Sequence, residues 1–220
     1  VFASQVINIT KRGEHFDLLY FRNTEQHTGS YDKVIISSGG KAYPTLGSKG
    51  ELFPVLSRLG HTLLPIQPAL APILADLNGL KSLQGVRLDL GVRLYDKDTL
   101  LASSAGNMIF TAYGMNGPAV MDISHHIPHP TNHSTSISLN LLHFYETEFD
   151  RLLIQKQNSQ FPISLLLGAF FPPKVVHCYT KLLGLSAKIS MSELDDHTIH
   201  TLVKQLKDTR LKVLGVRGFE

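Results

Sequence analysis

The sequence lacks the residues that mark several common classes of protein. Its 220 residues include one cysteine and no tryptophan. Because Cys178 stands alone, the chain has no internal disulfide framework, and we expect a cytoplasmic, reducing location. No apolar run approaches the roughly 20 residues of a membrane-spanning helix. The N-terminus also lacks the charged and apolar regions of a signal peptide. We therefore expect no membrane association.

The chain also has little excess of positive over negative charge. Lys and Arg together number 21, Asp and Glu number 18, and the basic residues are scattered along the chain. A protein that binds nucleic acid needs a clustered basic face, and proteins that bind single strands commonly have aromatic side chains interleaved with it. A small barrel can serve as a nucleic-acid platform, but this charge pattern predicts no nucleic-acid partner.

Glycine and proline are concentrated in one stretch. Residues 37–50 read SSGGKAYPTLGSKG and follow an apolar run at 34–36. A glycine-rich loop after a buried strand lets backbone N–H groups approach a ligand, and open α/β sheets bind ligands at the carboxyl ends of their strands. The loop has neither the G-x-G-x-x-G nor the G-x-x-x-x-G-K-[ST] spacing. The residues alone leave open whether it holds a ligand or is only a tight turn.

Hydrophobic periodicity predicts three kinds of region along the chain. Strand-rich segments come first, and a turn around Gly29 separates the second from the third. A helix at 50–59 follows, and Gly60 ends it. Period-two alternation at 85–94 predicts a half-buried antiparallel strand, and a set of helices then follows, with a capping box at Ser190 and Glu193. The remaining strands are predicted at 5–9, 15–22, 32–36, 108–111, 119–123, 136–142 and 211–216, and the helices at 144–155, 163–171, 174–183 and 192–206.

Four blocks of sequence together resemble the HI0933-like family of FAD-dependent flavoprotein oxidoreductases. They are the strand and glycine loop at 34–50, LGH at 59–61, PALAPI at 68–73 and FTAYGMNGPA at 110–119. The resemblance implies an α+β chain made of a remnant of an FAD-binding α/β domain, a small antiparallel β-barrel insert and a helical subdomain. The implied divisions are residues 1–70, 71–142 and 143–208, with 209–220 as a strand returning to the barrel.

The same resemblance implies a function for the intact protein. It would pass hydride or electrons between a nicotinamide or organic substrate and FAD, with NAD(P)H as a possible electron donor. The chain would be an internal piece of a longer protein. It would lack the N- and C-terminal parts of its own FAD domain, bind FAD weakly or not at all, and be inactive alone. The alternative is a non-catalytic insert that gates or binds a small-molecule substrate.

Site residues follow from the resemblance, position by position. Those expected to bind the cofactor are Val6, Ser37, Ser38, Gly39, Gly40, Lys41, Tyr43, Thr45, Gly47 and Ser48. Those expected on the substrate side are Phe110, Thr111, Tyr113, Asn116 and Gly117. The chain departs from the family pattern at Ala112, where the family has histidine, and at Glu51 and Leu52, where the family has a further glycine.

A histidine cluster raises the question of a metal site. It comprises His125, His126, His129 and His133. The spacing matches no helical ligand pair, and neither a cysteine nor a nearby carboxylate completes a tetrahedral set. We therefore expect a polar loop between strands and no metal.

Overall fold

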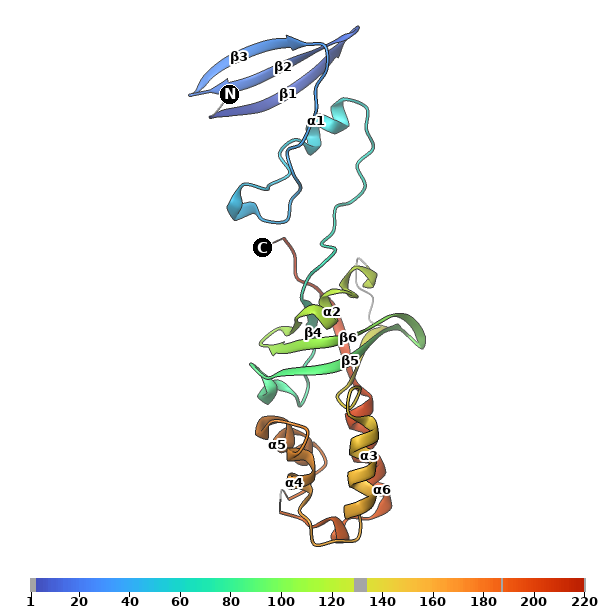
Figure 1. Cartoon of the computed structure of the whole chain (residues 1–220). Helices are drawn as coiled ribbons and strands as arrows, with labels where there is room; N and C mark the ends of the chain where they lie inside the picture. The colour runs from blue at the N-terminus through green and yellow to red at the C-terminus, as the bar shows by residue number, and fades with distance from the viewer. Residues whose placement is uncertain (1–2, 129–133, 187, 220) are drawn as a thin grey trace. The chain divides into compact units, whose positions relative to one another are not determined.

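The chain forms two compact units. The computed structural model describes residues 3–128, 134–186 and 188–219 (Figure 1). The first unit comprises Val1–Pro68 and Gly218–Glu220, and the second comprises Ala69–Arg217. Helices and strands are mixed, and an antiparallel barrel is present, so the predicted α+β class with a barrel insert is confirmed. The finer domain limits that the resemblance implies stay a prediction.

The first unit begins with a three-stranded antiparallel sheet. Its strands β1 (Ser4–Arg12), β2 (His15–Arg22) and β3 (Glu25–Tyr31) pair in chain order. The turn between β2 and β3 is Asn23-Thr24, with φ of 49° and 73°, as a two-residue type I′ hairpin requires. The predicted turn around Gly29 was wrong. Gly29 lies inside β3, a polar strand that pairing with β2 stabilises although its own residues carry no apolar alternation.

The predicted strand at 32–36 was also wrong, because these residues are irregular. Ile35 is 91% exposed. A central strand of an α/β sheet needs neighbouring strands to pair its backbone and helices to cover its faces. The described residues offer this segment neither. The glycine loop follows, with a short 3-10 helix η1 (Pro44–Leu46), and then α1 (Phe53–Arg58) ends before Gly60 at φ 96°, as predicted.

The second unit is built on a closed antiparallel barrel. Among the described strands the order is β4-β7-β6-β5-β8-β9, and β9 pairs with β4 to close it. The bounds are β4 (Ile73–Ala75), β5 (Arg87–Asp96), β6 (Thr99–Thr111), β7 (Gly114–Asn116), β8 (Thr135–Asn140) and β9 (Thr209–Val216). The alternation read at 85–94 is confirmed as β5. Closure depends on β9, which the chain reaches only after all the described helices.

The predicted strand at 119–123 is instead the short helix α2 (Pro118–Met121). Gly117 adopts φ 108°, and Pro118 occupies the first helical turn, where its fixed φ favours a helix start. The side-chain oxygen of Asn116 accepts a 2.7 Å hydrogen bond from the Gly117 N–H. Ala119 and Val120 are then buried against the barrel. The local turn at Gly117 and Pro118 therefore makes these residues a helix, and the hydrophobicity pattern does not reveal that turn.

Helices and short 3-10 turns complete the second unit. They are η2 (Lys81–Leu83), η3 (Ser124–His126), α3 (Glu146–Lys156), α4 (Ile163–Gly168), α5 (Pro173–Leu182), η4 (Met191–Glu193) and α6 (Asp196–Lys207). Pro172 and Pro173 separate α4 from α5, as predicted. Helices α3 and α6 lie side by side (Figure 1), where Lys207 Nζ donates to Glu146 Oε1 at 2.6 Å. No described helix has the length and apolarity that crossing a bilayer requires.

The capping box at Ser190 and Glu193 is present but starts η4 and not the long helix. The Ser190 N–H donates to Glu193 Oε2 at 2.8 Å, and the Ser190 hydroxyl bonds the same carboxylate. These bonds favour the ionised form and lower the pKa of Glu193. Helix α6 begins four residues later than predicted, where Asp195 accepts a 2.7 Å hydrogen bond from the Thr198 N–H.

The barrel and the helices share one hydrophobic core. Phe110 of β6, Ile137 of β8 and Phe149 of α3 have no exposed surface and belong to the same cluster. Tyr179 of α5 is also in it, and its hydroxyl lies 2.7 Å from the Thr209 hydroxyl. Burial raises the pKa of Tyr179 although the bond to Thr209 works the other way, so the phenol stays neutral. The helices are therefore held in fixed positions against the barrel.

Candidate functional site

A pocket in the first unit lies where the start of β1 meets the glycine loop. Its volume is about 250 Å³. The lining residues are Ser4, Gln5, Val6, Ser38, Gly47, Lys49, Gly50, Glu51 and Leu52. The strand contributes one wall and both ends of the loop contribute the other. The wall from the loop carries one ammonium, one carboxylate and one hydroxyl, so the pocket is polar.

Hydrogen bonds fix the shape of the loop. The Ser48 hydroxyl donates to the Gly40 carbonyl at 2.9 Å and closes residues 40–48 into a compact turn. Within that turn the Ser48 N–H donates to the Tyr43 carbonyl at 3.1 Å. Gln5 Nε2 donates to Glu51 Oε2 at 3.3 Å, which ties β1 to the end of the loop. The loop is therefore ordered by its own polar groups and not by packed side chains.

The front of the loop leaves backbone donors open. No hydrogen bond found among the described residues uses the N–H groups of residues 37–42. These residues are all exposed, and Gly39 has φ 74°, a conformation that favours glycine. Backbone N–H groups need hydrogen-bond partners, and successive ones in a turn can bind an anion. The donor set suits the phosphate groups of a dinucleotide.

The structure brings some of the predicted cofactor residues together and not others. Val6, Ser38 and Gly47 line the same pocket. Gly39, Gly40 and Ser48 adjoin it, since a Cβ on Gly39 would lie 3.7 Å from the Ser48 hydroxyl oxygen. The four other predicted residues lie outside the pocket lining, all exposed: Ser37, Lys41, Tyr43 and Thr45. The Lys41 ammonium lies 5.8 Å from the centre of the Phe219 ring.

Sequence reasoning missed the charged residues of this pocket. Lys49 and Glu51 line it on either side of Gly50. Gly50 has φ 71°, and a Cβ there would lie 2.6 Å from the Phe53 ring, so this glycine permits the close approach of α1. In the sequence, Glu51 stands out only as a departure from the family pattern. The signal available in the sequence was the pair of charged residues that flank Gly50.

The predicted substrate-side residues lie at the turn between β6 and β7. Phe110 has no exposed surface and packs inside the barrel, so its side chain supports the turn and does not face a ligand. The Thr111 hydroxyl is buried and has no partner among the described residues. The Tyr113 ring lies 5.1 Å from the guanidinium of Arg217. The neighbouring Ala112 is exposed, so a methyl group stands where the family pattern has an imidazole.

Close backbone contacts hold this turn in place. A Cβ on Gly114 would lie 2.2 Å from the Ile73 carbonyl oxygen, and one on Gly117 would lie 2.8 Å from the Asn107 carbonyl oxygen. Both residues also have positive φ, 148° and 108°. Glycine is therefore required at both positions for the strands to approach.

The histidine cluster falls partly outside the described residues. His125 and His126 belong to η3, and their rings lie 4.0 Å apart. His129 and His133 lie outside the part of the chain that the structure describes. In the described part, no three side chains of His, Cys, Asp or Glu come together as metal ligands would.

Comparison with known proteins adds three findings. Residues 67–220 match the family model described as HI0933-like protein barrel and H2TH domain. The chain is 29% identical over 194 residues to the 3-dehydro-bile acid delta(4,6)-reductase of Clostridium scindens, covering 86% of this chain and 47% of that protein. It is 25% identical over 221 residues to the ribosomal RNA dihydrouridine synthase of Escherichia coli, covering 98% of this chain and 52% of that protein. The chain spans about half the length of these curated relatives.

Proposed function

Because the chain belongs to the HI0933-like protein family, we propose that it is the central part of a flavin-dependent oxidoreductase. The observation that carries the proposal is the pocket that joins Val6, Ser38 and Gly47, with the open N–H groups of residues 37–42 beside it. An apolar segment at 34–36, in which Ile35 is exposed and its two neighbours are half-buried, leads into this loop. We propose that the rest of the FAD domain, outside these 220 residues, covers that segment. A reducing, cytoplasmic location belongs to the same proposal.

Each part of the site has a role in this proposal. Bound FAD would supply the redox chemistry. The N–H groups at the front of the loop bind phosphate oxygens, and Val6 presents strand backbone to the adenine. Thr111, Tyr113, Asn116 and Gly117 form the substrate-side wall, with Phe110 supporting them from the barrel interior. The exposed Ala112 contributes no proton donor, so a substrate proton must come from another group.

The names of the two relatives suggest a substrate class. A 3-oxo steroid with 4,6 double bonds and the uracil ring of uridine both contain a carbon–carbon double bond conjugated with a carbonyl group. We propose reduction of such a bond, with NAD(P)H as the electron donor. A uridine in RNA is the second candidate substrate beside a steroid. The alignment with the RNA-modifying relative covers 98% of this chain at 25% identity, and that with the bile acid reductase covers 86% at 29% identity, so both substrates are kept.

Flavin binding by the complete gene product tests the proposal. We expect a purified protein that is yellow and retains FAD. Ser38→Tyr, which fills the pocket, should weaken FAD binding at least about tenfold, an effect of about 1.4 kcal/mol. Ser30→Tyr adds the same bulk at an exposed position of β3 outside the pocket lining and should leave binding unchanged. The 220-residue chain alone should take up little FAD.

Two results would contradict the proposal. A complete gene product that takes up no added FAD would leave the chain as a non-catalytic module that binds or gates a substrate. Equal FAD binding by the wild type and Ser38→Tyr would show that FAD does not bind in this pocket.

A further inference from the structure

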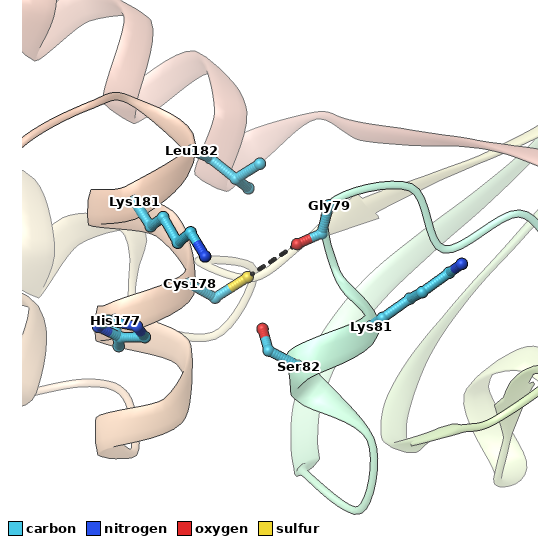
Figure 2. Close-up of a pocket in the computed structure, with 7 residues that line it drawn as sticks. All are labelled: Gly79, Lys81, Ser82, His177, Cys178, Lys181 and Leu182. Carbon is cyan, nitrogen blue, oxygen red and sulfur yellow. Dashed lines mark hydrogen bonds between the residues drawn. The ribbon is translucent and has the colours of Figure 1, made fainter.

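A second pocket lies inside the second unit, between α5 and the turn that leads into η2. Its volume is about 500 Å³. Residues lining it include Lys81, Ser82, His177, Cys178, Lys181 and Leu182. The Cys178 thiol donates to the Gly79 carbonyl at 3.4 Å, so the cysteine joins the two walls (Figure 2). Figure 2 shows the Lys181 ammonium and the Ser82 hydroxyl turned into the space between those walls, while Lys81 extends to the other side of the turn.

The lining is cationic and has no carboxylate. The surrounding sequence has the same bias, because residues 151–192 contain five Lys or Arg and no Asp or Glu. Lys174, His177 and Lys181 are spaced to share one face of α5. The opposite face carries Val175 and Tyr179, which are buried in the core. Packing therefore directs the basic side chains of α5 outward.

Among the described residues, no carboxylate pairs with the basic side chains of α5. We call Lys174, His177 and Lys181, with Ser82 of η2 opposite them, the basic face. None of the ion pairs found within the described part of the chain uses these three basic residues. Lys174 Nζ donates only to the Gln84 carbonyl, at 3.4 Å. An uncompensated group of cations beside a hydroxyl attracts phosphate oxygens.

We propose that the basic face binds the phosphate backbone of a single RNA strand, with one phosphate in the pocket between Lys181 and Ser82. The charge continues beyond the pocket to Lys174, about 10 Å along α5. A small anion would need only the pocket, whereas a polymer uses the whole face. The inference deepens the proposed function and rests on it, because it says where an RNA substrate would be held.

The expectation of no nucleic-acid partner rested on basic residues that are scattered in sequence. The fold brings Ser82 of η2 next to His177 and Lys181 of α5, and Lys174 is spaced to share their face of that helix. Phosphate contacts of this kind position a strand without reading its sequence. Recognition of the target base would then belong to the flavin site.

Fluorescence anisotropy with a labelled single-stranded oligouridine tests the proposal. The protein is the 220-residue chain without added flavin. Lys174→Gln with Lys181→Gln should lower affinity about tenfold and reduce the slope of log K against log salt by about 1.4, since each phosphate contact to a single strand contributes about 0.7. The control, Lys188→Gln with Lys204→Gln, changes the net charge equally at exposed positions outside the pocket lining. It should change affinity less than about twofold.

Ser82→Asp is a second variant, because it places a carboxylate in the pocket without removing a lysine. It should also weaken RNA binding, with an unchanged circular dichroism spectrum and melting temperature. An equal loss of RNA affinity in the two double-lysine variants would show that RNA is attracted by the overall charge and would overturn the proposed site. Displacement by millimolar inorganic phosphate with no salt slope, or tighter binding to anionic lipid vesicles than to RNA, would overturn the RNA assignment.

Failure of the RNA-binding proposal can be distinguished from failure of the flavin proposal. The anisotropy experiment contains no FAD, and the FAD experiment contains no RNA. Loss of RNA binding in the α5 variants with FAD uptake intact in the complete gene product supports both proposals. Absence of FAD uptake with RNA binding intact contradicts only the flavin proposal.

Discussion

The two units use apolar residues in opposite ways. In the second unit, Ile73 and Ile137 have no exposed surface and belong to one continuous core. In the described part of the first unit, Ile9 and Val55 are the fully buried hydrophobic residues, and Ile35 is 91% exposed. Full burial of an isoleucine stabilises a fold by about 1.5–3 kcal/mol. The second unit therefore has a core of its own, whereas the first leaves apolar side chains such as Ile35 exposed.

The largest expected contrast is between glycines of the two units. Gly114→Ala should cost about 4 kcal/mol or more, because the new methyl would clash with the backbone of β4 and φ is 148°. Gly40→Ala in the loop should change stability by less than about 0.5 kcal/mol, since nothing lies within 4 Å of the new methyl. Urea unfolding followed by circular dichroism measures both. A large loss from Gly40→Ala would show that the loop is packed.

The second contrast is between isoleucines. Ile137→Ala should cost about 3 kcal/mol, because it leaves a cavity in the barrel core. Ile35→Ala should change the stability of the 220-residue chain by less than about 0.5 kcal/mol, because the side chain is already exposed. In the complete gene product, we expect Ile35→Ala to become destabilising if the rest of the FAD domain covers it. An equal, small effect in both proteins would refute that covering.

The smallest contrast is between serines. Ser190→Ala removes a bond to the Glu193 carboxylate and should lower the melting temperature by about 2–4 °C at pH 7. Ser48→Ala removes one exposed bond to a carbonyl and should produce a smaller shift. Differential scanning calorimetry measures both changes.

The Ser190→Ala effect should depend on pH. Folding lowers the pKa of Glu193 below its ordinary value of 4.5, so its stabilising contribution is full above that value. The contribution is lost as the pH falls through the lower pKa of the folded state. The melting temperatures of Ser190→Ala and the wild type should therefore converge in acid. If the difference in melting temperature does not depend on pH, the Glu193 carboxylate is not involved and the effect comes from the serine alone.

Local sequence predicted the elements that have a strong signal of their own. Strand β5 has period-two alternation, α4 and α5 are separated by two prolines, and Gly60 ends α1. Elements that depend on partners were mistaken. The polar β3 exists because β2 pairs with it, and the apolar segment 32–36 is irregular because the described residues give it no partner. Hydrogen-bonding partners outweigh intrinsic preference in strands.

The sequence by itself determined the family and the glycine loop. These depend on residue identity, which is local information. Only the tertiary structure decided that β9 closes the barrel and that Cys178 meets Gly79, 99 residues earlier in the chain. The basic face arises in the same way, because η2 and α5 come together only when the hydrophobic core forms. Packing and charge are properties of neighbours in space, and the order of residues does not state which distant segments become neighbours.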